Sequence, residues 1–405
     1  MWLPIIEPSQ LSTFQKKLEE ITVSIEEELP RIQRIGLLGG IAGLSVFFFY
    51  YARMTGKIKY YDISSQLLSQ SIQSLPHLQP DTFSKGYAGI LWAYQHLKNH
   101  YSIDFTPPLI PKNIHTILTD FMMDELSKLN YDPLHGAIGY GTYFLEYQPS
   151  DEVSSYLSNL VKGLKKISHK KGKKRYWETI NEIHSLKGVN SGLTHGMAGI
   201  VVFLTRLYKT GICKEIVKDL LEGAVEYFLY LHDLMQTKAQ SISCFPVWVS
   251  SDGQLSSGTL ALGFGDLSIA LALWHASNVL ENNVWKEKAI NVFSKSLTRN
   301  TKETNVIKDA SLSLGTSGMA HIYNRIYHYT GDERFKEAAR YWLFETLEMG
   351  KNETGVAGYS AWRGESVNRR DKEFGIIEGI AGIGLVLISS ISPIEPLWDK
   401  CLMVS

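Results

Sequence analysis

The residues best placed to do chemistry stand in two loops, each directly before a long apolar run. His195 lies five residues after Asn190 and immediately before one such run. Asp132 stands four residues before Gly136, where an earlier run begins. A helix N-terminus favours neutral imidazole, which suits general acid/base work near neutral pH. His195 is therefore a candidate acid or base, and Asp132 is a candidate partner for it.

Both residues also have ordinary structural interpretations. A histidine in this setting is often a hydrogen-bonded structural residue, and an aspartate before a helix is often an N-cap or turn residue. The two loops occupy equivalent places before two apolar runs. On that ground we expect His195 and Asp132 to face one cavity.

An internal repeat indicates how these loops are positioned. A Gly-x-x-Gly-like step followed by an apolar run of helical length occurs seven times, and successive steps are far enough apart for two helices with their loops. Helices that are apolar on most sides are buried, so these runs are predicted inner helices. The steps are 40–43, 86–89, 136–139, 196–199, 265–268, 315–318 and 379–382.

Amphipathic segments between the steps are predicted outer helices. Seven outer and seven inner helices predict an all-α fold, an α/α toroid formed by residues 1–405 as one domain. An open solenoid of the same hairpins is the alternative. We expect the step glycines to crowd backbones at one rim and to leave free N–H groups facing a central cavity. The outer segments are 14–29, 64–75, 113–129, 152–167, 215–235, 284–298 and 333–349.

Composition restricts the partners and the compartment. Lys plus Arg and Asp plus Glu are both 41, so no overall field favours nucleic acid. Three cysteines without a Cys-x-x-Cys pair indicate a reducing, cytoplasmic location. The N-terminus does not resemble a secretory signal. The most apolar stretch, 35–52, holds four glycines, and we interpret it as a buried helix and not a transmembrane segment.

The sequence resembles the lanthionine synthetase C (LanC-like) family across essentially the whole chain. The segment from Asn190 to Gly199 is similar to the family's Asn-x-Gly-x-x-His-Gly-x-x-Gly block, and Tyr131-Asp132 is similar to its Tyr-Asp block. The segments 265–273, 315–318 and 378–383 resemble the corresponding later repeats. The resemblance implies a toroid that closes thioether rings in lanthipeptide biosynthesis.

The family's zinc ligands are missing. Gly263 replaces the cysteine of Trp-Cys-Tyr-Gly, while Ser313 and Leu314 replace the Cys-His pair. Zinc needs Cys, His or carboxylate donors at about 2.0–2.3 Å, which this set does not offer. We therefore predict no metal and no cofactor. Other residues considered for a relocated site are Cys244, His135, His275 and His321, but no pair of them has the spacing of a known site.

The implied reaction adds a cysteine thiol to dehydroalanine or dehydrobutyrine of the same peptide. His195 would be the acid/base with Asp132 in support, and Phe264, Asn190 and His135 would bind substrate. The implied partners are a dehydrated precursor peptide, a lanthipeptide dehydratase and an exporter. A cytoplasmic enzyme at the periphery of a membrane-associated complex fits these partners.

Two other function classes stay open. Loss of the zinc ligands favours a non-catalytic peptide-binding scaffold that acts with a dehydratase. An α/α-barrel glycosidase or terpene cyclase would need paired cavity carboxylates or an Asp-rich motif, and we find neither.

A basic run at 165–175 contains six lysines and Arg175. It is interpreted either as a solvated loop or as a dock for an acidic leader peptide or partner protein. Its confinement to one short segment argues against nucleic acid.

Overall fold

Helices make up most of the described chain. The computed structural model describes residues 1–405 apart from 79–81, 101–109, 182–185, 238–240 and 365–368. The chain packs as two compact units, which are described separately. The first unit comprises Met1–Pro111 with Asn300–Trp398, and the second comprises Lys112–Arg299 with Asp399–Ser405.

In the first unit, inner helices pack side by side and outer helices cover them. Helix α15 packs between α2 and α13, α4 packs on α2, and α1, α3 and α14 lie on their outer sides. The bounds are α1 Leu11–Glu28, η1 Leu29–Arg31, α2 Ile41–Thr55, α3 Ile58–Gln73, η2 Leu75–His77, α4 Tyr87–His100, α12 Lys302–Asn305, α13 Thr316–Thr330, α14 Glu333–Met349, β7 Ala361–Trp362, β8 Arg370–Asp371 and α15 Ile380–Ile391. A last short helix, η3, spans Leu397–Leu402.

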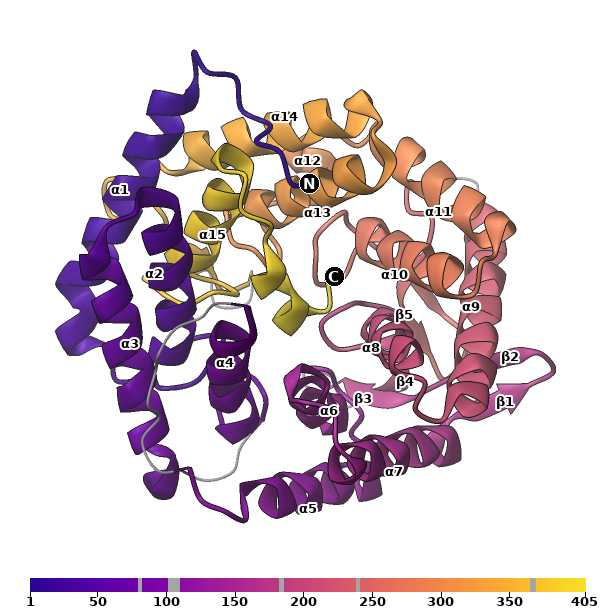
Figure 1. Ribbon diagram of the computed structural model, residues 1–405. Helices are drawn as coiled ribbons and strands as arrows, with labels where there is room; N and C mark the ends of the chain where they lie inside the picture. Colours follow the sequence, from indigo (N-terminus) through magenta and orange to yellow (C-terminus); the bar gives the residue numbers. More distant parts are fainter. Residues whose placement is uncertain (79–81, 101–109, 182–185, 238–240, 365–368) are drawn as a thin grey trace. The chain divides into compact units, whose positions relative to one another are not determined.

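The second unit repeats this arrangement. Helix α8 lies between α6 and α10, while α5, α7, α9 and α11 cover them (Figure 1). The bounds are α5 Ile114–Ser127, α6 Ala137–Glu146, α7 Asp151–Ile167, α8 Met197–Thr210, α9 Lys214–Gln236, α10 Asp266–Val279 and α11 Asn283–Ser296.

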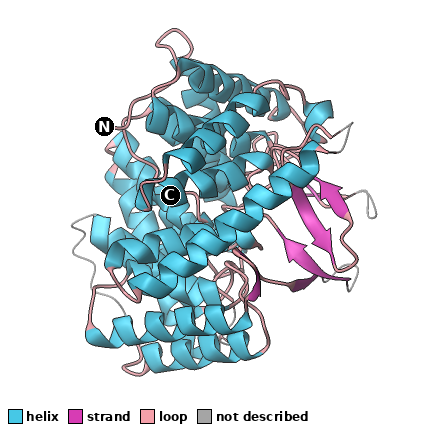
Figure 2. Cartoon of the chain, turned by 90° about the vertical axis from the view of Figure 1, so that its right-hand side faces the viewer, coloured by secondary structure: helices cyan, strands magenta, loops and turns pink. Residues whose placement is uncertain are grey.

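The second unit also contains strands, which the sequence patterns did not predict. Strands β1 (His169–Lys171) and β2 (Lys174–Tyr176) form an antiparallel hairpin. Strands β3 (Thr179–Asn181), β4 (Leu186–Asn190), β5 (Pro246–Ser250) and β6 (Leu255–Ser257) form an antiparallel sheet in that order (Figure 2). Each strand is too short to show a clear period of two, and β4 and β5 are far apart in the chain. Residues 169–175 of the basic run therefore lie in a hairpin and not in an irregular loop.

The predicted helices are otherwise confirmed. Each predicted outer segment overlaps an amphipathic helix, and each predicted step begins an inner helix within two residues of its first glycine. The apolar stretch 35–52 contributes to buried α2, but the helix starts only at Ile41. Among the described residues, no helix is both long and apolar enough to cross a membrane.

The step glycines serve a close contact between each loop and the helix that follows it. A Cβ at Gly199 would overlap the carbonyl oxygen of Leu193, and one at Gly43 would overlap that of Leu37. The same closeness gives one N–H group of the first turn a partner in the loop: Ala198 donates to the carbonyl of Ser191 at 3.3 Å. Our expectation of free N–H groups facing a cavity is therefore wrong for Ala198, because the preceding loop folds back and accepts from it.

Candidate functional site

Two loops of the second unit bring His195 and Asp132 together. His195 ends the loop between β4 and α8, and Asp132 lies between α5 and α6. Nδ1 of His195 donates a hydrogen bond to Oδ2 of Asp132 at 2.8 Å. The other carboxylate oxygen, Oδ1, accepts from the backbone N–H groups of Leu134 and His135, each at 2.8 Å. Asp132 is thus a turn residue, as one interpretation of the sequence held, and also the partner of His195.

The surroundings of Asp132 favour its ionised form. Burial raises the pKa of this carboxyl, but the hydrogen bond and charge of His195, together with His135, outweigh that effect, and the pKa lies below its usual value. Because the ionised carboxylate can only accept, the proton of the shared hydrogen bond stays on Nδ1 of His195. In the neutral ring, Nε2 is then the nitrogen that can take up or release a proton.

Two rings flank the imidazole of His195. The ring of His135 stacks on it with centroids 5.1 Å apart and planes 15° apart. The ring of Phe264 lies 5.9 Å away at 27°. His135 is exposed and Phe264 is half-buried. The structure therefore brings three of the predicted substrate-binding and catalytic positions around His195 into one place.

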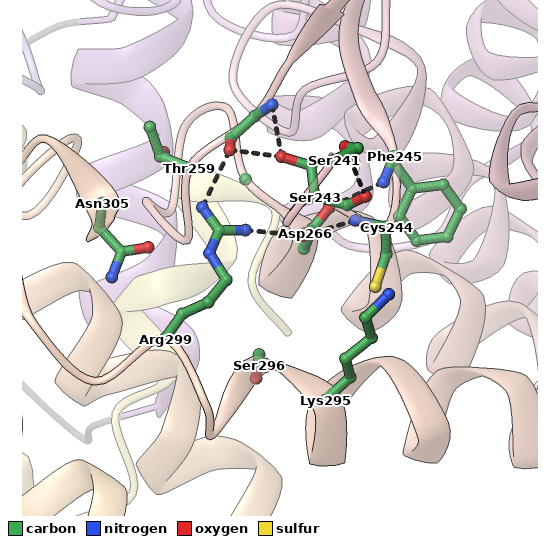
Figure 3. A network of polar contacts seen from close by, with 12 residues as sticks. Ser241, Ser243, Cys244, Phe245, Thr259, Asp266, Lys295, Ser296, Arg299 and Asn305 are labelled. Carbon is green, nitrogen blue, oxygen red and sulfur yellow. Dashed lines mark hydrogen bonds and ion pairs between the residues drawn. The ribbon is translucent and has the colours of Figure 1, made fainter. Parts of the chain in front are cut away.

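A buried ion pair holds the segment that carries Phe264, and sequence reasoning missed it. Asp266, the first residue of α10, accepts from Nη1 of Arg299 at 2.9 Å and from the backbone N–H groups of Cys244 and Phe245, each at 2.9 Å (Figure 3). Nη2 of Arg299 donates to the carbonyl of Gly258 at 2.9 Å. These bonds tie the loop before α10 to its neighbours. The sequence offered one signal for this ion pair, which is the charged Asp266 at the start of an otherwise apolar run.

Burial is the largest influence on the pKa values of Asp266 and Cys244 in this network. It raises the pKa of Asp266 to about 6, against the opposing effects of the two backbone donors and Arg299. It also raises the pKa of the Cys244 thiol to about 11, with the charge of Asp266 adding to the effect. Figure 3 shows the amino group of Lys295 pointing toward the Cys244 sulfur. At neutral pH, Cys244 is a buried protonated thiol and not a reactive thiolate.

Asn190 shapes the His195 loop. Its side-chain oxygen accepts the backbone N–H of Gly192 at 2.8 Å, an Asx-type turn. A Cβ at Gly196 would come within 2.6 Å of that same oxygen. The structure thus gives Asn190 a part in the turn, and its predicted contact with substrate stays a prediction.

Comparison with known proteins identifies the family of this chain. A model of the family described as lanthionine synthetase C-like protein matches residues 31–403. The chain belongs to that family. The solved structure of nisin cyclase is similar over 96% of this chain and 97% of that chain, with a TM-score of 0.73 and 16% sequence identity. A comparison with curated protein sequences finds no match.

The structural likeness establishes the fold. The predicted α/α toroid is confirmed, and the alternative prediction of an open solenoid is set aside. His195 and Asp132 therefore belong to a LanC-like chain, at the loops where the sequence resembled the family's His-Gly and Tyr-Asp blocks.

The LanC-like zinc positions do not fit a metal in this chain. Gly263 has no side chain, and its carbonyl accepts the backbone N–H of Leu193 at 3.0 Å. Leu314 is a hydrocarbon side chain that is 48% exposed. Ser313 supplies only a hydroxyl. None of the three offers the thiolate, imidazole or carboxylate that zinc requires.

A second set of donors lies around Asp132. One atom each of Asp132, His135 and His195 falls within 4.8 Å of the others, which is close enough for a shared ion. However, the lone pairs of imidazole lie in the ring plane, and the two rings are nearly parallel. Both cannot aim at one ion unless a ring rotates. The geometry as it stands fits a shared proton better than a metal.

Proposed function

We propose that this chain is a lanthionine cyclase that adds peptide cysteine thiols to dehydroalanine or dehydrobutyrine without zinc. The observation that carries the proposal is the 2.8 Å hydrogen bond between His195 and Asp132. Family membership and the likeness to nisin cyclase support a cyclase-type role. The presence of an acid/base pair in a chain without the family's zinc ligands favours an enzyme over an inactive relative.

The pair can conduct the whole proton cycle. Nε2 of His195 accepts the proton of the cysteine thiol, and Asp132 stabilises the resulting imidazolium through Nδ1–H. The thiolate then attacks Cβ of the dehydro residue, an S–C bond forms, and the electron pair of the C=C bond moves toward Cα and its carbonyl. The imidazolium returns its proton to Cα. No proton or electron is consumed overall.

Positioning supplies much of what metal activation would otherwise provide. A thiol with a pKa near about 8.5 is only a few per cent thiolate at neutral pH, but it is still an able nucleophile. The thiol and its acceptor already belong to one peptide, and holding them in reactive orientation raises the effective molarity toward the roughly 10⁵–10⁸ M of well-oriented intramolecular reactions. The rings of Phe264 and His135 would restrict how a peptide approaches His195.

The proposed substrate is a dehydrated precursor peptide, which implies a dehydratase upstream and an exporter downstream. The described cysteines Cys213, Cys244 and Cys401 are free, which supports a reducing cytoplasmic compartment. Attachment to a membrane-associated biosynthetic complex is compatible with this assignment.

One observation favours a second candidate function. Gly263, Ser313 and Leu314 occupy the zinc positions, as expected if the chain has become a non-catalytic scaffold that presents a peptide to a dehydratase. Such a scaffold would bind peptide without accelerating any ring closure.

The deciding experiment uses a synthetic peptide with one cysteine and one dehydroalanine at ring-forming spacing. Ring closure is followed by thiol alkylation and mass spectrometry, because unreacted cysteine gains mass and cyclised cysteine does not. We expect the metal-free protein to accelerate closure well above the rate of peptide alone. Equal rates with and without protein would replace the cyclase by the scaffold.

A further inference from the structure

The basic hairpin has two faces that differ in charge compensation. In the register of β1 and β2, Lys170 lies opposite Arg175, and Lys171 lies opposite Lys174. Successive residues of a strand point to opposite sides, so these two pairs occupy opposite faces. The first pair is partly compensated by Asp219 of α9, which lies 2.8 Å from Arg175 and 3.8 Å from Lys170. That face is structural.

On the second face, Glu178, Glu226 and Asp233 line the same surface as the lysine pair, but in the described part of the chain none of them forms an ion pair with Lys171 or Lys174. Nζ of Lys174 lies 3.7 Å from the ring centroid of Tyr230, but within the described part of the chain neither Lys171 nor Lys174 has an ion pair. Like charges directly opposite each other in a sheet are destabilising. An anion from another molecule would relieve this repulsion.

Aromatic rings continue from the lysine pair along one wall. Tyr176 stacks on Tyr227 with centroids 4.8 Å apart, and Tyr227 contacts Tyr230 at 6.1 Å. Tyr230 is 41% exposed, which is unusual for so large a ring. These tyrosine side chains offer a flat surface with apolar rings and polar hydroxyl groups to a bound molecule.

The lysine pair and the tyrosine wall border a groove in the second unit. Its apolar lining comes from Val189 of β4, Val249 of β5, and Leu231 and Leu234 of α9. The enclosed volume is about 200 Å³. Pockets for whole small molecules usually measure about 300–1,000 Å³, so this groove suits a side chain of a peptide better than a free metabolite.

From these features we propose that the groove binds an extended acidic segment of the peptide substrate, with a carboxylate at Lys171 and Lys174 and an adjacent apolar side chain against Val189 and Val249. The substrate class rests on the proposed function. Single-stranded nucleic acid is the competing occupant, because it also uses cations and stacking rings. Glu178 lines the same groove and pairs with His169 and Lys187, so the anionic contact is restricted to Lys171 and Lys174, which suits a single carboxylate better than a run of phosphates.

The groove is connected to the candidate site by one strand. Strand β4 lines the groove at Val189 and ends at Asn190, and the following loop carries His195. Six residues span at most about 20–22 Å when fully extended, so the groove lies within that distance of His195 along the backbone. About six extended peptide residues are therefore the most that are needed to span the straight-line distance from the groove to His195.

The test measures binding of a labelled twelve-residue peptide with two aspartates flanking a leucine and no Cys, Ser or Thr. Fluorescence anisotropy is recorded with the full chain at low salt, where such contacts are strongest. The variant Lys171→Glu with Lys174→Glu should weaken binding at least tenfold. The matched variant Lys162→Glu with Lys209→Glu changes the net charge equally, involves exposed lysines outside the groove, and should change affinity less than twofold.

A second variant tests the wall without altering charge. Tyr230→Leu should weaken the peptide severalfold while its circular dichroism spectrum stays that of the wild type. Unchanged affinity in the Lys171/Lys174 variant would overturn the proposal, as would tighter binding of a twelve-nucleotide DNA strand. Ring closure on a short peptide without the acidic segment is measured in parallel. If the acidic peptide binds but no ring closes, the proposed cyclase activity is wrong and the proposed groove stands. If rings close but the acidic peptide does not bind, the proposed groove is wrong and the cyclase activity stands.

Discussion

His195 and Asp132 are 63 residues apart in the chain, yet Nδ1 of one lies 2.8 Å from Oδ2 of the other. Asp132 is itself fixed by two backbone donors of its own turn. The carboxylate is therefore oriented before it meets the imidazole, and the imidazole is held in one tautomer. Such an arrangement is what a proton-transfer pair requires, and each of its parts can be tested.

Changing His195 to Asn should abolish most ring closure. The amide keeps a hydrogen-bond donor toward Asp132 but cannot titrate, and general acid/base catalysis is worth about 10²–10⁴-fold. Closure should slow by at least about a hundredfold, with peptide affinity nearly unchanged. Alkylation and mass spectrometry give the rate, and anisotropy gives the affinity. An equally active variant would mean that proximity alone suffices.

Purified protein should contain no stoichiometric zinc, because the family's ligand positions hold Gly263, Ser313 and Leu314. Elemental analysis after dialysis provides the measurement. One tightly held zinc per chain would contradict the prediction. In that case, loss of the zinc in His135→Ala would place the ion among Asp132, His135 and His195. Cys244→Ser is the control, because it removes a buried thiol outside that group.

Asp132→Asn should lower the free energy of unfolding at neutral pH and make that free energy depend less on pH in the acid range. The folded pKa of Asp132 is depressed, so the pair's contribution is present above about pH 4 and is lost as pH falls through the folded pKa. Hydrogen bonds to charged groups are worth about 1.5–3 kcal/mol, which sets the expected loss at pH 7. Chemical denaturation at pH 7 and pH 3 measures it. If wild type and variant differ equally at both pH values, the charge pairing contributes nothing.

Arg299→Met should cost about 3–5 kcal/mol of unfolding free energy at pH 8, because it leaves the Asp266 carboxylate buried without its partner. The folded pKa of Asp266, about 6, exceeds its unfolded value near 3.9, so the folded state binds the proton more tightly and stability falls as pH rises between about 4 and 6. Loss of the cation extends that fall above pH 6 in the variant.

Denaturation curves across pH 4 to 8 would display this difference. Arg299→Lys is the matched control, since it keeps the charge and should retain part of the stability. If the unfolding free energy of the wild type instead rises from pH 4 to pH 6, the Asp266 carboxyl does not take up a proton in this range and the prediction is wrong. The same variants test whether the network holds Phe264, because ring closure should decline with Arg299→Met even where the chain stays folded.

The helices could be predicted from the sequence because their signals are local. Apolar runs of helical length mark the inner helices, amphipathic spacing marks the outer ones, and the glycine steps mark where inner helices begin. The prediction that zinc ligands are missing at Gly263, Ser313 and Leu314 likewise rests on residue type. Each of these properties depends on residues a few positions apart.

Only the tertiary structure decided which side chains meet. The stacking of His135 on His195, the Asp266–Arg299 pair and the pairing of β4 with β5 join residues that no short pattern relates. The hairpin at 169–176 is tied to α9 through Asp219, which pairs with Lys170 and Arg175 on one of its faces. Contacts of this kind are determined by how the helices pack, because burial and charge pairing act between neighbours in space whatever their distance along the chain.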